Sequence, residues 1–406
     1  MRRLGVLMAV CFVDMLGLML VAPLMPFYAL RLHSPEWMVG PLIASFAVAQ
    51  LISSPVWGRV SDRYGRRPAL LIGLGASAFA YVIFGFATSL WMLFLSRIVQ
   101  GAGGGTTGVA QAYVADTMAP SDRAKALGWL SAATSAGVVI GPFIGSFAAR
   151  YGTAAPGVVA AAMVLVNVIC AWKWLPESRA QRSASSASAL PADTPRSVQQ
   201  ALGDIMRHPA TPAHRVIWIY VVGMLALNVV IGVLALYLKD TFGVTEKTIG
   251  YFFPIFGLVG VLMRVWLVGW VNARYGEVRT MQIGTVLLGL GLALMPLPAI
   301  LGLPMAMGLF IAFLTLVPAG TALLFPASTS LVSQRTERHE LGLVMGAQQT
   351  FRGVMSIVGP VGATLAFDKL GHGVPFFIAA GVVAVAGLLA VREPRAHTAA
   401  APAAAD

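Results

Sequence analysis

The stretch that decides the fold is Gly58-Arg-Val-Ser-Asp-Arg-Tyr-Gly-Arg-Arg67, which separates two long apolar runs. Its four arginines are expected at the cytoplasmic edge of a membrane helix, because positive residues are retained on that side. Topology alone requires neither the acid Asp62 nor the glycines Gly58 and Gly65. Gly58 allows another helix to approach closely, and Gly65 permits a tight turn. The stretch therefore predicts a structured loop between two membrane helices.

The composition of the 406-residue chain indicates a membrane protein, with 58% hydrophobic and 11% charged residues. Soluble domains carry about 25% charged residues. Runs such as 69–87 and 302–324 are apolar on every face, which excludes the alternating pattern of a transmembrane barrel. We expect an all-α integral membrane fold in which the first apolar run is a true span, since it lacks a signal-peptide cleavage site. Twelve transmembrane helices are predicted, at about 5–26, 38–58, 68–88, 91–113, 127–149, 155–175, 215–237, 249–270, 280–300, 303–326, 342–366 and 374–391.

The two halves of the chain resemble each other. Gly269-Trp-Val-Asn-Ala-Arg-Tyr-Gly276 repeats the first stretch 211 residues later, and Gly359-Pro360 repeats Gly141-Pro142 218 residues later. Such repeats predict two pseudo-symmetric six-helix bundles around a site near the membrane midplane, the architecture of secondary transporters. The expected domains are an N-terminal bundle over 1–176, a cytoplasmic linker over 177–212, a C-terminal bundle over 213–394 and a disordered tail over 395–406.

The net charge of +12 is explained by topology. With both termini in the cytoplasm, 20 of the 28 lysines and arginines lie on the cytoplasmic side of this multi-pass chain. There they face anionic lipid headgroups, and they lack the single-face clustering with aromatic residues that nucleic-acid binding requires. Cys11 and Cys170 lie within apolar runs, so neither a disulfide nor a metal site is expected.

Residues 58–67 resemble motif A of the major facilitator superfamily, and the resemblance extends over the whole chain. It implies the superfamily fold of two six-helix bundles, with this loop acting as a cytoplasmic latch whose acid engages the start of the eleventh span, near 340–342. The second copy carries Ala273 where Asp62 falls, so a weaker second latch is expected. The gate residues implied by the resemblance are Gly58, Asp62, Arg63, Gly65, Arg66 and Arg67.

The fourth span carries Arg97-x-x-Gln100-Gly101-x-Gly103 and continues to Asp116, in a pattern similar to motif B of the same superfamily. An arginine within a span costs at least about 2.5–3.5 kcal/mol on insertion scales, so Arg97 is expected to face a cavity or a partner. The alternative is that its side chain extends to the nearer membrane surface.

The fifth span contains Gly137-x-x-x-Gly141-Pro142-x-x-Gly145, which resembles motif C, the antiporter signature of the superfamily's exporters. The resemblance implies export. Small residues four apart also permit close helix contact, and proline permits a kink, so ordinary helix packing is the alternative.

Asp14 is the one carboxylate near the middle of a predicted span. Burial disfavours the charged form of an acid, so such a group can bind and release protons. Asp14-x-x-Gly17 followed by Pro23 and Pro26 resembles the first span of tetracycline and related twelve-span drug:proton antiporters, which implies a role for Asp14 in coupling, with Arg97 as a candidate partner. The alternative is a structural aspartate held permanently by that partner.

The superfamily's central cavity implies a set of further candidates for substrate contact. Each amide is as readily explained by hydrogen bonding between helices, and each aromatic ring by packing. Either Arg352 in the eleventh span or Arg264 in the eighth could bind an anionic substrate group, which would argue against a cationic drug as substrate. The substrate cavity candidates are Gln50, Gln100, Asn228, Phe253, Phe256, Phe325, Gln348, Gln349 and Arg352.

These features predict a monomeric, proton-coupled transporter of the bacterial inner membrane that exports small amphipathic organic compounds by alternating access. Its partners are the small-molecule substrate, protons and membrane lipids. No cofactor, metal or ATP is expected, because no nucleotide-binding, metal-ligand or catalytic motif occurs, and an enzyme is excluded on the same ground. The alternatives are a proton-linked nutrient importer or facilitator, and a lipid flippase or transporter-derived receptor.

Overall fold

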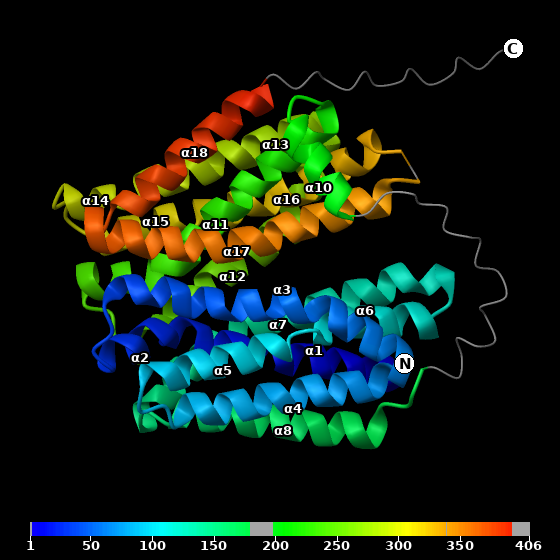
Figure 1. Cartoon of the computed structure of the whole chain (residues 1–406). Coiled ribbons are helices and arrows are strands. Elements are labelled where there is room, and N and C mark those ends of the chain that lie inside the picture. Colours follow the sequence, from blue (N-terminus) through cyan, green and yellow to red (C-terminus); the bar gives the residue numbers. More distant parts are fainter. Residues whose placement is uncertain (1, 179–197, 338, 392–406) are drawn as a thin grey trace, which may run out of the picture.

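The computed structural model describes residues 2–178, 198–337 and 339–391. Across these residues the chain forms helices and turns without a β-strand, which confirms the all-α prediction. Figure 1 shows two bundles, with the N-terminal half below and the C-terminal half above. The predicted tail at 395–406 lies outside the described residues, as do 179–197 of the predicted linker.

Each predicted span of the first half corresponds to one helix or to a pair of helices. The fourth span is broken at Gly103, Gly104 and Gly105, since each glycine costs about 1 kcal/mol in a helix interior. Side chains of the second span satisfy carbonyls at this break: Gln50 donates to Gly104 O at 3.0 Å and Trp57 to Ala102 O at 2.5 Å. The helices are α1 (Arg2–Val21), α2 (Met25–Arg31), α3 (Val39–Tyr64), α4 (Arg66–Gly85), α5 (Leu90–Ala102), α6 (Thr106–Thr117), α7 (Pro120–Ala148) and α8 (Ala155–Trp174).

The second half repeats this order after a short helix that the sequence analysis did not predict. This helix, α10 (Val198–Arg207), lies in the predicted linker and packs on the C-terminal bundle through the buried Ala201 and Ile205. The remaining helices are α11 (Pro212–Phe242), α12 (Phe252–Leu262), a π-helical turn (Met263–Leu267), α13 (Val268–Leu294), α14 (Leu297–Ile300), α15 (Ala306–Leu314), α16 (Leu316–Arg335), α17 (Leu341–Leu370) and α18 (Val374–Val391).

The helices account for all twelve predicted spans. Nine described segments are long and apolar enough to cross a membrane. One of them, Ile249–Ile300, holds two spans, because the backbone departs from helical geometry at Gly276 (φ 76°, ψ 167°). The broken pair α5 and α6 and the shorter α18 supply the other two. The predicted twelve-helix architecture is therefore confirmed.

The bundles have two ends, which we name by their loops. The linker side carries the ends of α3, α8 and α16, and the distal side carries the ends of α2, α7, α11 and α17 (Figure 1). Within the halves, α1 packs on α7 and α11 packs on α17. Between the halves, α3 packs on α17 and α7 packs on α12. These four helix pairs follow the internal repeat. The α1–α7 pair of the first half corresponds to the α11–α17 pair of the second half, and the α3–α17 pair corresponds to the α7–α12 pair.

Candidate functional site

Asp14 lies on α1, within the N-terminal bundle. Its carboxylate accepts a hydrogen bond of 2.6 Å from the hydroxyl of Thr106, the first residue of α6 after the glycine break. The side chain is neither fully buried nor fully exposed. The break between α5 and α6 therefore places a hydroxyl donor opposite the intramembrane acid, and the acid keeps part of its surface accessible.

Arg97 does not pair with Asp14, contrary to the pairing considered from the sequence. Its side chain on α5 is 3% exposed, and its guanidinium lies over the Phe46 ring at 6.0 Å from the centroid. Among the described residues it forms no ion pair, and its Nε and Nη2 atoms are buried without hydrogen-bond partners. A buried guanidinium with unpaired N–H donors can bind an anionic group or a polar acceptor.

Tyr81 on α4 lies within electrostatic reach of both Asp14 and Arg97. Both charged groups lie close enough to act electrostatically on the Tyr81 hydroxyl, which accepts a 2.6 Å hydrogen bond from the Gln100 amide. An added methyl at Gly17, one turn from Asp14, would lie 3.0 Å from the same hydroxyl. Tyr81 and Thr106 were missed by the sequence analysis, because a tyrosine and a threonine in apolar spans carry no motif of their own.

The predicted gate loop is a network of charges within the N-terminal half. Arg66 pairs with Asp62 at 3.0 Å and with Asp116 at 2.9 Å. Glu177, which follows α8, accepts the backbone N–H groups of Arg66 and Arg67 at 2.9 and 3.2 Å, and so caps the N-terminus of α4. Gly65 has φ +108°, which a residue with a side chain rarely adopts. Motifs A and B therefore meet at the Arg66–Asp116 pair.

The other predicted gate residues occupy this loop or its flank. Arg63 lies over the ring of Tyr64, with its guanidinium carbon 5.4 Å from the centroid, and Arg67 donates to the carbonyl of Trp172. Gly58 has open space where a side chain would stand. The engagement of Asp62 with residues 340–342 stays a prediction, since the hydrogen bonds and ion pairs described for this loop all join parts of the N-terminal half.

The second copy of the loop has the same backbone and different chemistry. Gly276 takes a positive φ, as Gly65 does. Glu277 stands where Arg66 falls, and its carboxylate accepts hydrogen bonds from Ser330 at 2.6 Å and Gln334 at 2.8 Å. These described contacts of Glu277 are to uncharged side chains, whereas Arg66 forms two ion pairs.

The glycines of motif C pack α7 against α1. An added methyl would lie 2.5 Å from Phe12 O at Gly137, 2.6 Å from Leu16 O at Gly141 and 2.2 Å from Leu20 O at Gly145. All three distances are too short for a carbon atom, so only glycine fits. Gly101 of motif B fills the same role between α5 and α3, where a methyl would lie 2.3 Å from Phe46 O.

The prolines of the two repeats close the distal side by a crossed contact. A methyl added at Gly250, at the start of the eighth span, would lie 2.2 Å from Pro142 O. A methyl added at Gly40, at the start of the second span, would lie 2.5 Å from Pro360 O. Gly250 N also donates to Ser146 Oγ at 2.7 Å. Each Gly-Pro pair therefore packs against the start of a helix in the opposite half.

Polar contacts between the halves gather on the same side. Arg31 pairs with Glu246 at 2.5 Å, Arg150 donates to the Tyr251 hydroxyl at 2.7 Å, and Thr364 donates to Trp37 O at 3.0 Å. On the linker side, added methyls at Gly58 and Gly342 would meet no atom within 4 Å. The two halves are therefore in close contact on the distal side. On the linker side, the helices at Gly58 and Gly342 are not in close contact with a neighbouring helix.

The predicted substrate residues fall into three groups. Several amides are committed to protein partners: Asn228 donates to Met224 O at 2.8 Å, and Gln348 donates to Thr329 at 3.4 Å. Gln349 and Arg352 are exposed. The aromatic candidates Phe253, Phe256 and Phe325 are all partly buried, and Phe325 packs on Tyr220 with ring centroids 5.2 Å apart.

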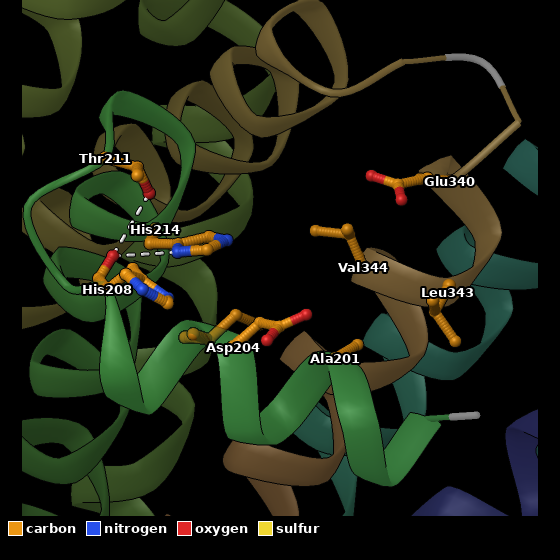
Figure 2. A pocket seen from close by; sticks show the side chains of 9 residues that line it. Ala201, Asp204, His208, Thr211, His214, Glu340, Leu343 and Val344 are labelled. Carbon is orange, nitrogen blue, oxygen red and sulfur yellow. Dashed lines mark hydrogen bonds between the residues drawn. The ribbon is translucent and has the colours of Figure 1, made fainter. Parts of the chain in front are cut away.

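A pocket of about 380 Å³ lies between α10, the start of α11 and the start of α17. Figure 2 shows His214 and Thr211 turned toward His208, whose carbonyl they approach at 2.9 and 3.2 Å, with Asp204 and Glu340 at the rim. This pocket is on the linker side of the C-terminal half, away from Asp14 and Arg97 on α1 and α5.

Comparison with known proteins assigns the chain to a class of membrane transporters. The family model described as Major Facilitator Superfamily matches residues 7–267 and 216–406. The chain therefore belongs to the major facilitator superfamily.

Its relatives include resistance proteins of bacteria. The chain is 31% identical to "Multidrug resistance protein 2" of Bacillus subtilis (strain 168), over 94% of this chain and 92% of the relative. It is 26% identical to "Tetracycline resistance protein, class B" of Escherichia coli, over 87% and 86% of the two chains. These names describe the relatives' activities.

Solved structures share the fold at low sequence identity. The human organic anion transporter MFSD10 (TETRAN) has a TM-score of 0.66 at 21% identity, over 96% of this chain and 99% of that chain. A bacterial homologue of the iron transporter ferroportin in an inward-facing state has a TM-score of 0.75 at 16% identity, over 97% and 98%. These likenesses support the fold of two bundles.

Proposed function

We propose that this transporter exports small amphipathic organic compounds in exchange for protons, by alternating access. The observation that carries the proposal is the placement of Asp14, a partly accessible acid with one hydroxyl donor and no paired cation among the described residues. No fixed positive charge holds this acid in its ionised form, so it can bind and release a proton as its surroundings change.

Arg97 and Tyr81 are proposed to sense the charge of Asp14. The buried guanidinium has unpaired donors, and both it and Asp14 act electrostatically on Tyr81. Loss of the Asp14 proton adds a negative charge beside Tyr81, which favours movement of Arg97 toward the acid. Uptake of a proton by Asp14 removes this attraction, and substrate is proposed to compete with the proton for the deprotonated state.

The two sides of the bundles are proposed to open in turn. The distal contacts of Pro142 with Gly250 and of Pro360 with Gly40 close the outer side in this state. Closing the linker side would bring motif A near α17, and the charge network around Arg66 is proposed to stabilise that second state. Substrate and proton select between the states by their different affinities for each.

The direction and the substrate class rest on the relatives and on motif C. Proteins named for multidrug and tetracycline resistance align over most of the chain. The excess of lysine and arginine on the linker side supports a cytoplasmic position for that side and for both termini, in the bacterial inner membrane. We propose a monomer surrounded by lipid, with the proton gradient as the energy source in place of a cofactor.

Transport in everted vesicles tests this proposal. Vesicles from a host without endogenous drug pumps, expressing the chain, should accumulate a fluorescent cationic dye when a proton gradient is imposed. Asp14→Asn should abolish this accumulation at equal expression, because the amide cannot exchange a proton. Asp122→Asn, which changes an exposed acid at the start of α7, is the matched control and should transport normally. Gradient-driven accumulation by the Asp14→Asn variant would contradict the assigned role of Asp14.

A further inference from the structure

Three potential metal ligands meet where the halves close on the distal side. Glu36 begins the short helix before α3, Asp240 lies in the last turn of α11, and His372 lies in the turn between α17 and α18. One ligand atom from each residue lies within 4.8 Å of the other two. Glu36 belongs to the N-terminal half and the other two to the C-terminal half, so the cluster exists only while the distal side is closed.

The charges of the cluster are incompletely balanced. Asp240 is 15% exposed, and its Oδ1 accepts from Lys239 Nζ at 2.7 Å. Its Oδ2 is buried and has no donor nitrogen or hydroxyl among the described residues, and the Glu36 carboxyl lies within hydrogen-bonding reach of Asp240 across the interface. Lys369, three residues before His372 in the sequence, is paired with Asp368 at 3.0 Å. A second positive charge between Glu36 and Asp240 would relieve the repulsion of two carboxylates and satisfy the buried oxygen.

The third donor selects the kind of cation. Two carboxylate oxygens and one imidazole nitrogen suit Zn²⁺ and similar transition metals, whereas Mg²⁺ and Ca²⁺ prefer oxygen donors alone. The His372 ring is stacked on the buried Phe367, with centroids 4.5 Å apart and an interplanar angle of 5°. This stacking fixes the orientation of the ring, and the exposure of His372 leaves the cluster open to the distal solution.

We propose that Glu36, Asp240 and His372 bind a divalent transition-metal cation that holds the two halves together on the distal side. A small approach of the three side chains brings their donors to the separations of about 3.3 Å that a tetrahedral Zn²⁺ with bonds near 2.0 Å requires. Because the metal binds one conformation, it stabilises the state with a closed distal side and slows the transport cycle.

Zn²⁺ titration of the purified full chain against a chromophoric chelator tests the site without any need for transport. We expect one tight equivalent per chain. His372→Ala, Glu36→Gln and Asp240→Asn should each weaken it by about tenfold or more, since even the outer partners of metal ligands contribute 10–100-fold. His339→Ala is the matched control, because His339 is exposed and lies 3.3 Å from the single acid Glu337; it should leave the affinity unchanged.

Hydrogen exchange with and without Zn²⁺ tests whether the metal joins the halves. Zn²⁺ should slow exchange both in residues 31–40 and in residues 239–251, and Glu36→Gln should remove both effects. Absence of a tight equivalent, an affinity that Glu36→Gln leaves unchanged, or an equal loss in His339→Ala would each overturn the proposal. A metal-free result would leave the proposed drug and proton exchange intact, since the vesicle assay measures that separately.

Discussion

A methyl group at Gly250 should force the distal side open. The added carbon would lie 2.2 Å from Pro142 O, and 2.6 and 2.7 Å from Oγ and Cβ of Ser146, whereas ordinary contact begins near 3.4 Å. All these atoms belong to the opposite half, so the clash is relieved by separating the halves. Gly250 is not among the described glycines with a positive φ, so alanine can adopt its backbone conformation.

The size of the effect follows from the cost of overpacking. Inserting a methyl into a packed interface costs about 1–3 kcal/mol, which corresponds to a shift of about 5- to 150-fold in a two-state equilibrium. The matched control is Gly145→Ala, whose methyl would lie equally close, 2.2 Å, to Leu20 O within the same half. That clash is present whether the distal side is open or closed, so it should lower stability without changing the equilibrium.

Distances between spin labels measure the shift. Tyr151→Cys and Ile300→Cys place labels at exposed distal positions, one in each half, in a background with Cys11→Ser and Cys170→Ser. Gly250→Ala should transfer population to longer label separations, and Gly145→Ala should not. An unchanged distance distribution in Gly250→Ala, or the same change in both variants, would refute the assignment of Pro142 and Gly250 to a gate.

Three further predictions concern stability, the first two measured by thermal unfolding in detergent and the third by limited proteolysis. Asp116→Asn should destabilise the protein by about 3 kcal/mol, because it leaves Arg66, whose side chain is only 10% exposed, without one of its two acids. A loss below about 0.5 kcal/mol, as for an exposed surface pair, would show that the Arg66–Asp116 pair does not stabilise the fold. Gly65→Ala and Gly276→Ala should each cost about 1–3 kcal/mol from backbone strain, and Gly65→Ala should cost more, since its methyl would also lie 2.5 Å from Glu177; equal losses would argue against the cap formed by Glu177. Ile205→Asp should release α10 and raise proteolysis near residue 207, because Ile205 is 1% exposed; unchanged cleavage would mean that α10 is not held through this face.

The sequence was sufficient for the architecture and for the positions of the motifs. Apolar runs of membrane length, the repeated glycine-arginine loop and the Gly-Pro repeats predicted twelve helices in two halves, and the structure has them. These features are local, so they can be recognised without knowing which helices touch. Asp14 is likewise recognised from the sequence alone, because it is a single acid within an apolar span.

The partners of the site residues could not be predicted from the sequence. Thr106 bonds to Asp14 because the glycine break places the start of α6 opposite α1, and no spacing rule relates residues 14, 81 and 106. Glu177 caps α4 although more than 100 residues separate them along the chain. The crossed contacts of Pro142 and Pro360 depend on how two bundles dock. The helix α10 is too short, at 10 residues, to stand out from a polar linker.

Proton release on drug binding tests the central claim most directly. Purified protein in weakly buffered detergent solution, at a pH where Asp14 is protonated in the absence of drug, is mixed with a transported compound while a pH indicator is recorded. Exchange of substrate for a proton at Asp14 predicts release of up to one proton per chain from the wild type and none from Asp14→Asn. Binding without release from the wild type, or equal release from the Asp14→Asn variant, would contradict it.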